Sequence, residues 1–200
     1  MKIENTCVVG FIPAFRALRN PRNSWDKSDS TIGKSTEIAP EGFVIGEKDL
    51  ELARKLIKAG SEHRKFIRLI GVSVDIIGPR YWLTEMDTYK VGVVRVSCSS
   101  FAKLGQSILT PEDFQDGDVS QNTLDELNDL AKKYLETKDL DFLRRYKKRL
   151  SEGYLQRSTF DMNYEVLINM YHQRKNHKLL EWHTICDWIY SLPYMKELME

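Results

Sequence analysis

The segment 69–77 (LIGVSVDII) is the feature that most constrains how this chain can fold. Its apolar side chains recur at every second position, so that one face of an extended strand is uniformly apolar: Ile70, Val72, Val74 and Ile76. A strand with one apolar face has to pair within a sheet and bury that face against other elements. The chain is therefore predicted to build a sheet that is covered by neighbouring elements.

The first half of the chain supplies the other expected strands and two helices. A short strand is expected at 6–12 (TCVVGFI), followed by a long polar loop at 19–46 and an amphipathic helix at 47–59. A helix is expected over 79–90, where a proline suits the first turn, and a β-like run follows at 91–96. Long loops in compact domains are often functional, which draws attention to 19–46.

The second half of the chain is expected to be helical. The sequence Thr110-Pro111-Glu112-Asp113 is typical of a helix start. Two charged helices are expected at 123–135 and 139–150, and a long helix at 163–190 that is broken near Asn176. Strands followed by a helical half indicate an α+β fold, with a central, mostly antiparallel sheet covered by helices. The length suits one domain, residues 1–200.

Composition and charge exclude several classes of function. Lys and Arg total 30 and Asp and Glu total 29, so the net charge of +1 gives no reason to expect nucleic acid or a membrane as a partner. No apolar run is long enough to span a bilayer and no signal peptide is evident. Cys7, Cys98 and Cys186 are far apart, and the histidines lack the spacing of metal ligands. We therefore expect no metal and a reducing, cytoplasmic setting.

The late helix places a charge on an apolar stripe. Val166, Met170 and Tyr171 belong to this stripe, and Arg174 follows Met170 by one helical turn. Asn163 precedes Arg174 by eleven residues, about three turns, so both are expected on one face. A guanidinium that faces a core needs an anionic partner. Either a ligand or a protein carboxylate satisfies this requirement, and the sequence leaves both open.

The same late segment resembles a motif of the flavin-dependent thymidylate synthases, which has the form N-x-R-x-L-x-x-(F)-x-x-x-R followed by a tryptophan. Asn163 and Leu167 lead to Arg174 with the family's spacing, and Trp182 follows. Asn169 is also similar to a polar position of this motif.

A second block is similar to the same family. The family has a histidine, an F-x-F-like strand, a small residue with proline, and a helix that ends in RHR. Here His63 precedes the strand 72–76, Gly78-Pro79 follow, and the expected helix runs to Lys90. The two blocks together cover roughly a third of the chain, in the family's order.

The signature RHR-x-x-S-x-N-E-x-S-x-R-Y falls on residues 88–101, which read TYKVGVVRVSCSSF. Lys90 keeps one positive charge, Phe101 keeps the aromatic residue, and Cys98 stands at a serine position. Two arginines, the histidine, the asparagine and the glutamate of the signature are replaced. Arginine binds phosphate through a bidentate fork that lysine and hydroxyl groups lack, so the replacements predict weak binding of FAD.

The resemblance implies a function and a set of residues. The family methylates dUMP to dTMP with methylenetetrahydrofolate, reduced FAD and NADPH, in homotetramers whose active sites lie between subunits. It implies dUMP binding by Arg174, Asn169 and Lys90, and FAD binding by His63, Asn163 and Lys90, with no catalytic residue assigned. A non-catalytic or re-purposed nucleotide-binding homologue is the alternative, and residues 88–101 distinguish the two.

A basic run in the polar loop has two interpretations. Arg16, Arg19 and Arg22 gather near the start of the loop, where they could supply phosphate contacts that the signature lacks. A solvated basic loop is the alternative reading.

Overall fold

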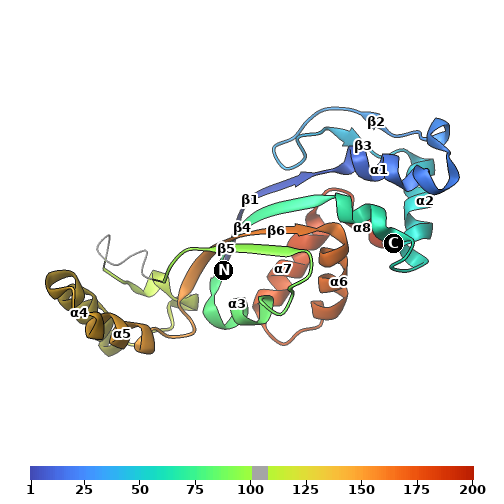
Figure 1. The fold of residues 1–200 in the computed structure, drawn as a ribbon. Helices are drawn as coiled ribbons and strands as arrows, with labels where there is room; N and C mark the ends of the chain where they lie inside the picture. Colours follow the sequence, from blue (N-terminus) through green and yellow to red (C-terminus); the bar gives the residue numbers. More distant parts are fainter. Residues whose placement is uncertain (101–107) are drawn as a thin grey trace. The chain divides into compact units, whose positions relative to one another are not determined.

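The computed structural model describes residues 1–100 and 108–200 (Figure 1). Contacts along the chain divide it into two compact units. Unit 1 comprises Met1–Ile3, Ile76–Thr88 and Val96–Thr159, and unit 2 comprises Glu4–Asp75, Tyr89–Arg95 and Phe160–Glu200. The structure combines helices with an antiparallel sheet, which confirms the predicted α+β class.

The main sheet has four strands in the order β1-β4-β6-β5. Their bounds are β1 Lys2–Val9, β4 Gly71–Pro79, β6 Leu155–Asn163 and β5 Val93–Ser97. The alternation predicted for β4 is confirmed, because Val72, Val74 and Ile76 are at most 1% exposed. Strand β6 was not expected from the sequence, which runs through polar residues there (LQRSTFDMN).

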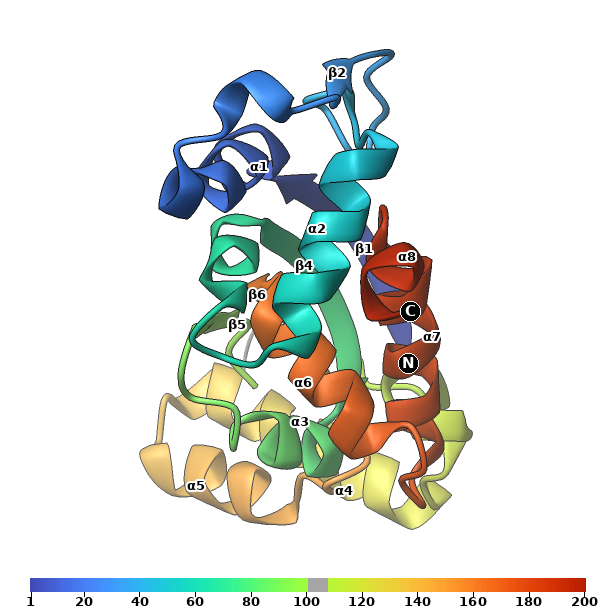
Figure 2. The same ribbon diagram turned by 90° about the vertical axis from the view of Figure 1, so that its right-hand side faces the viewer.

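Unit 2 holds most of the helices. These are α1 Phe11–Arg19, α2 Glu47–Lys58, α6 Tyr164–Arg174, α7 Leu180–Ser191 and α8 Met195–Met199, with the 3-10 helix η3 Arg64–Leu69. Helices α6 and α7 pack against each other, and α2 packs against α8 (Figure 2). The expected helix at 47–59 and the break near Asn176 are confirmed.

The expected strand at 6–12 is wrong at its end, because a helix begins at Phe11. Gly10 has φ of 100°, a left-handed conformation that favours glycine, and a Cβ there would lie 1.9 Å from the carbonyl oxygen of Leu69. The Glu41 carboxylate then accepts hydrogen bonds from the backbone N–H groups of Gly10 and Phe11, at 3.0 and 2.8 Å. Glu41 thus satisfies free donors at the start of α1 from within the polar loop.

The loop at 19–46 is more ordered than the sequence suggested. It contains the 3-10 helices η1 Asn20–Arg22 and η2 Trp25–Lys27, and an antiparallel pair of short strands, β2 Thr31–Ile32 and β3 Phe43–Val44. Phe43 of β3 packs on Phe11, with stacked rings whose centroids are 6.1 Å apart. The loop is therefore held against α1 by apolar as well as polar contacts.

Unit 1 contains the two charged helices predicted for the middle of the chain. They are α4 Gln121–Thr137 and α5 Leu140–Arg149, and they pack against each other (Figure 1). Ser120 and Asp139 cap their N-termini through side-chain hydrogen bonds. Their apolar faces form one buried cluster with neighbouring segments: Leu109, Phe114, Leu124, Leu127, Leu130, Tyr146, Leu150 and Tyr154.

Two further elements of unit 1 are shorter than expected. The helix predicted over 79–90 is α3 Arg80–Met86, so residues 87–90 lie outside it. The helix start predicted at 110–113 is the 3-10 helix η4 Pro111–Asp113, closed by a capping box between Thr110 and Asp113, and η5 Gln115–Gly117 follows it.

A buried ion pair joins α1 to α2. Arg19 Nε donates to Asp49 Oδ1 at 2.8 Å, and Asp49 is fully buried. The hydroxyl groups of Ser28 and Ser30 each donate to the other carboxylate oxygen at 2.6 Å. Burial alone would raise the pKa of the Asp49 carboxyl, but the hydrogen bonds from Ser28, Ser30 and Arg19 hold this pKa below its usual value.

This pair decides the role of one of the three loop arginines. Arg19 is 7% exposed and bound to Asp49, so it belongs neither to a solvated loop nor to an open phosphate site. Arg16 and Arg22 are exposed.

We expect the substitution Arg19→Ala to lower the free energy of unfolding by about 3–5 kcal/mol, because it leaves the buried Asp49 carboxylate without its cation. The exposed Arg16, on the same helix, provides the matched control, and Arg16→Ala should change stability by less than about 0.5 kcal/mol. Urea denaturation at neutral pH measures both variants. Equal losses in the two variants would contradict the structural role of the pair.

The ion pair of Arg19 and Asp49 also predicts how the stability of the folded state depends on pH. The pKa of Asp49 is lower in the folded state than the value of about 3.9 for an unfolded Asp. Its contribution to stability is therefore complete above about pH 4 and is lost as the pH falls through the folded-state pKa. Asp49→Asn cannot ionise, so its stability should fall less than that of the wild type between about pH 5 and pH 2. If the stability of the wild type and of Asp49→Asn changed with pH in parallel, the lowered pKa of Asp49 would be contradicted.

Candidate functional site

Arg174 is held by two aromatic side chains within unit 2. Its Nε donates to the hydroxyl of Tyr89 at 2.9 Å, and its guanidinium lies 4.6 Å from the ring centroid of Trp182. The Tyr89 hydroxyl in turn donates to Gln173 Oε1 at 3.0 Å. Arg174 is half-buried, and contact with an aromatic ring favours a desolvated guanidinium. Its planar group is therefore fixed in orientation before any ligand arrives.

The break in the late helix creates this arrangement. Helix α6 ends at Arg174, and α7 begins at Leu180, which places the fully buried Trp182 in its first turn. His177 lies in the connection, where its backbone N–H donates to the Arg174 carbonyl at 2.9 Å and its ring makes an edge contact with Trp182. A continuous helix would have carried Trp182 about two turns beyond Arg174.

Asn169 lies on the same helix as Arg174 but belongs to another polar cluster. Its Oδ1 accepts a hydrogen bond from Arg64 Nη2 at 3.0 Å. Arg64 Nε also donates to Glu165 Oε1 at 3.1 Å, and Arg68 binds the second oxygen of Glu165. Arg174 and Asn169 are five residues apart, about 140° around the helix, so they face different directions.

Glu165 occupies the arginine position of the family pattern N-x-R-x-L. In this chain the position carries a carboxylate, and two arginines of η3 bind it. The sequence analysis did not single out Glu165, Arg64 or Arg68. The spacing of Arg64 and Arg68, four residues apart and directly after His63, was the available signal.

Asn163 does not share a helical face with Arg174, contrary to the expectation from its spacing. It is the last residue of β6 and the N-cap of α6, where its Oδ1 accepts from the backbone N–H of Val166 at 3.1 Å. Its side chain is therefore used to start the helix. Its Nδ2 lies against Gly92, 3.0 Å from the position that a Cβ there would take.

His63 and Lys90 are exposed and lie on separate segments of unit 2. His63 is the residue before η3, and Lys90 lies between the end of α3 and the start of β5. Neither side chain forms a hydrogen bond with a residue that the structure describes. The five residues implied by the resemblance are thus placed on α6, at its cap and on two exposed turns, and the structure does not bring them together in one cavity.

The hydroxyl groups of Thr88 and Tyr89, in the signature stretch, form hydrogen bonds within the chain. Thr88, at the first arginine position, donates through Oγ1 to the Glu85 carbonyl at 2.7 Å. Tyr89, at the histidine position, is bonded to Gln173 and Arg174. Phe101, which would keep the aromatic residue of the signature, lies outside the described residues.

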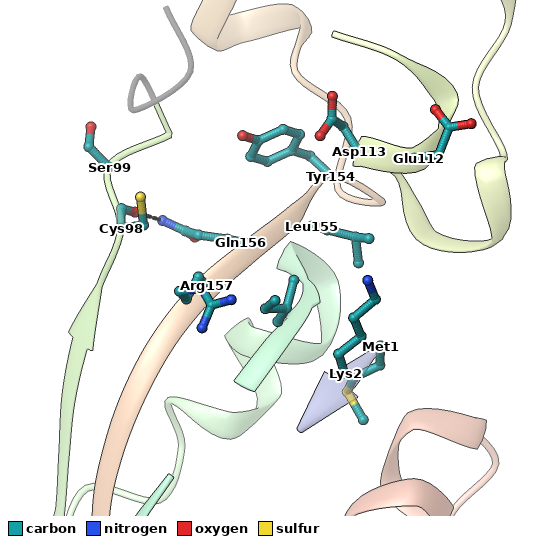
Figure 3. Close-up of a pocket in the computed structure, with 11 residues that line it drawn as sticks. Met1, Lys2, Cys98, Ser99, Glu112, Asp113, Tyr154, Leu155, Gln156 and Arg157 are labelled. Carbon is teal, nitrogen blue, oxygen red and sulfur yellow. Dashed lines mark hydrogen bonds between the residues drawn. The ribbon is translucent and has the colours of Figure 1, made fainter. Parts of the chain in front are cut away.

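A cavity of about 420 Å³ lies within unit 1 and includes Cys98 of the signature stretch (Figure 3). In Figure 3, Cys98 lies beside Gln156 and Arg157, with Tyr154 and Asp113 across from them. The side chain of Gln156 donates to the Cys98 carbonyl, and the Cys98 N–H donates to the Arg157 carbonyl at 2.8 Å. The cavity is therefore bounded by the segment after β5 and by the first residues of β6.

The cavity lining combines apolar walls with cations and hydrogen-bonding groups. Ile77 and Leu155 are apolar. Lys2 and Arg157 carry positive charge, and Glu112 and Asp113 carry negative charge. Burial raises the pKa of the Tyr154 hydroxyl above its usual value. The size and this mixture of groups suit a small polar ligand.

The fold itself defines the class to which this structure is similar: it is the fold of the flavin-dependent thymidylate synthases. Two solved structures of this enzyme from Helicobacter pylori, both in complex with FAD and dUMP, match all of this chain and 97% of theirs. The TM-scores are 0.70 and 0.73, at 17% and 18% sequence identity. No protein-family model and no curated protein matches the sequence. At this identity the likeness establishes the fold.

Proposed function

We propose that this protein binds dUMP or a closely related pyrimidine nucleotide. The observation that carries the proposal is the match over the whole chain to enzymes solved with dUMP. The fixed orientation of the Arg174 guanidinium supports it, since this group suits a phosphate. The leading function is the family reaction, which converts dUMP to dTMP with methylenetetrahydrofolate, reduced FAD and NADPH.

The residues of the signature stretch do not fit a tightly held FAD. A bound diphosphate needs concentrated positive charge, and Lys90 is the one cation at the three RHR positions. The hydroxyl groups of Thr88 and Tyr89 are already bonded within the chain, and Asn163 is used as a helix cap. A phosphate at these groups would have to break existing hydrogen bonds. We therefore derive no step of a reaction through the flavin.

This disagreement favours a second candidate function. A nucleotide-binding homologue that has lost the flavin would keep dUMP affinity but would not form dTMP. The internal bonding of Thr88 and Tyr89 supports this candidate over the complete reaction. An assay for dTMP, with added FAD, NADPH and methylenetetrahydrofolate, separates the two.

We expect Arg174→Ala to weaken dUMP binding by on the order of 2–4 kcal/mol, because a charge-assisted contact to the ligand is lost. Lys58, an exposed residue of unit 2, provides a control of the same charge change. Lys58→Ala should leave the affinity unchanged. Calorimetric titration with dUMP measures all three proteins. Equal affinity in the wild type and Arg174→Ala, or no binding to the wild type, would overturn the proposal.

We expect the purified protein to carry little FAD and to bind added FAD weakly. Losing two or three charge-assisted contacts, each worth about 1.5–3 kcal/mol, lowers affinity by several powers of ten. The absorbance spectrum of the fresh protein and fluorescence titration with FAD measure this. A stoichiometric, tightly held flavin would show that other residues replace the signature, and would favour the complete reaction.

We further propose a homo-oligomer, as in the family, whose interface includes residues 90–100. Strand β5 is an edge of the sheet. Two of its own valines are exposed, Val94 at 61% and Val96 at 68%, and so is Val91 just before it, at 88%. An apolar edge strand of this kind needs a cover.

Light scattering should therefore give a mass that is a multiple of the 23.4 kDa chain. Val94→Lys, which places a charge on the exposed edge, should shift the mass toward the monomer. Ile32, at 63% exposure in β2, provides a control of similar exposure, and Ile32→Lys should not change the mass. A wild-type mass of one chain at micromolar concentration would refute the oligomer.

A further inference from the structure

Helix α5 carries a strong local excess of positive charge. Five of its last six residues are cations, and none of the six is acidic: Arg144, Arg145, Lys147, Lys148 and Arg149. All five are exposed, in a chain whose net charge is only +1. The charge is therefore concentrated on this helix and balanced by acidic residues elsewhere.

Some cations of α4 and α5 have acidic partners, but three on α5 have none among the described residues. Lys133 pairs with Asp129 on α4 at 2.7 Å, and Arg149 pairs with Glu126. In contrast, Arg144, Arg145 and Lys148 form no ion pair with any residue in the ranges 1–100 and 108–200. Asp141 stands one turn before Arg145, but the two are not in contact range of an ion pair. These three charges are therefore open to an external anion.

The unpaired cations lie on one face of α5. Arg144 and Lys148 are one turn apart, with Arg145 beside them, while Tyr146 points into the core and is 1% exposed. Like charges at this spacing destabilise a helix. The helix dipole favours cations in the last turn, but Arg144 and Arg145 are the fifth and sixth of ten residues. The dipole therefore does not account for the face that they form with Lys148.

We propose that this face of α5 binds the phosphate backbone of double-stranded nucleic acid without sequence preference. Guanidinium groups match phosphate oxygens through two hydrogen bonds, and a row of cations on a helix suits a row of phosphates. The proposed contacts are to phosphate groups, which carry no sequence information, so binding should not depend on sequence. The residues of this face are not those proposed to bind the nucleotide, so the two functions can be tested separately.

Two other polyanions fit the face less well. Single-stranded nucleic acid is usually held by exposed aromatic rings, and both aromatic residues of α5, Phe142 and Tyr146, face inward with the buried cluster. A membrane-binding helix inserts an apolar face, but that of α5 is packed in the core, and Leu140 is its one strongly exposed apolar residue. The near-neutral net charge, from which we expected no nucleic acid, does not reveal such a local face.

The test compares two triple variants that remove the same charge. Arg144→Gln/Arg145→Gln/Lys148→Gln removes the face, and Lys34→Gln/Lys48→Gln/Lys58→Gln removes three exposed lysines of unit 2. Fluorescence anisotropy with a labelled DNA duplex of mixed sequence, at about 25–200 mM salt, gives affinity and its salt dependence. Circular dichroism checks that both variants keep their helix content.

We expect the wild type and the lysine control to bind the duplex with similar affinity. The variant of α5 should bind at least about tenfold more weakly, and the slope of log K against log salt should fall by about 2–3, one unit for each lost phosphate contact. If both variants lost the same affinity for the duplex, the effect would be one of net charge alone, and the proposal would be overturned. It is also overturned if the wild type does not bind the duplex at low salt, or binds only single strands or phosphatidylserine vesicles.

Discussion

The buried face of β4 is the constraint on which the rest of the sheet depends. Its side chains need cover along the whole strand, and β4 lies between β1 and β6, so its register fixes both neighbours. Just before β4, the carbonyl of Ile70 accepts a hydrogen bond from the backbone N–H of Tyr164 at 3.0 Å. Tyr164 is the first residue of α6, and it is fully buried. The start of α6, and with it the direction of Arg174, is therefore set by the strand that the sequence marks most clearly.

The polar residues of α6 follow from this placement. Glu165, one residue into the helix, is reached by Arg64 and Arg68 from η3, and Asn169 completes that cluster one turn later. Arg174 ends the helix and is held from another direction by Tyr89. Glu165, Asn169 and Arg174 thus each have a partner from the chain itself, which stabilises the half-buried charges. A ligand at either cluster has to compete with bonds that already exist.

Strands and helices whose apolar residues recur at regular spacing could be predicted from the sequence, and those without such spacing could not. The alternation of β4 and the apolar spacing of α2, α4 and α5 are local, so sequence alone predicts these elements. Strand β6 alternates in burial, but one of its buried residues is the polar Ser158, and its pairing with β4 and β5 determines its structure. The helical spacing from Asn163 to Arg174 was misleading, since a capping residue lies outside the helix that it starts. The Arg19–Asp49 pair and the cluster around Glu165 join residues 30 to 105 positions apart, and no local pattern reports such contacts.

The distribution of charge separates this chain from the signature that it resembles. Where that signature has arginines, the chain has Thr88 and Ser100, and where the late motif has an arginine it has Glu165. The cations are found instead in η3, where Glu165 neutralises them, and on α5, where three remain unpaired among the described residues. A net charge of +1 says nothing about where the cations cluster, because the net charge is a sum over the whole chain. Binding of an anion depends on the local electrostatic field. The positive charge available to an anionic ligand therefore lies mainly on α5 and around Arg174, and only weakly at residues 88–90.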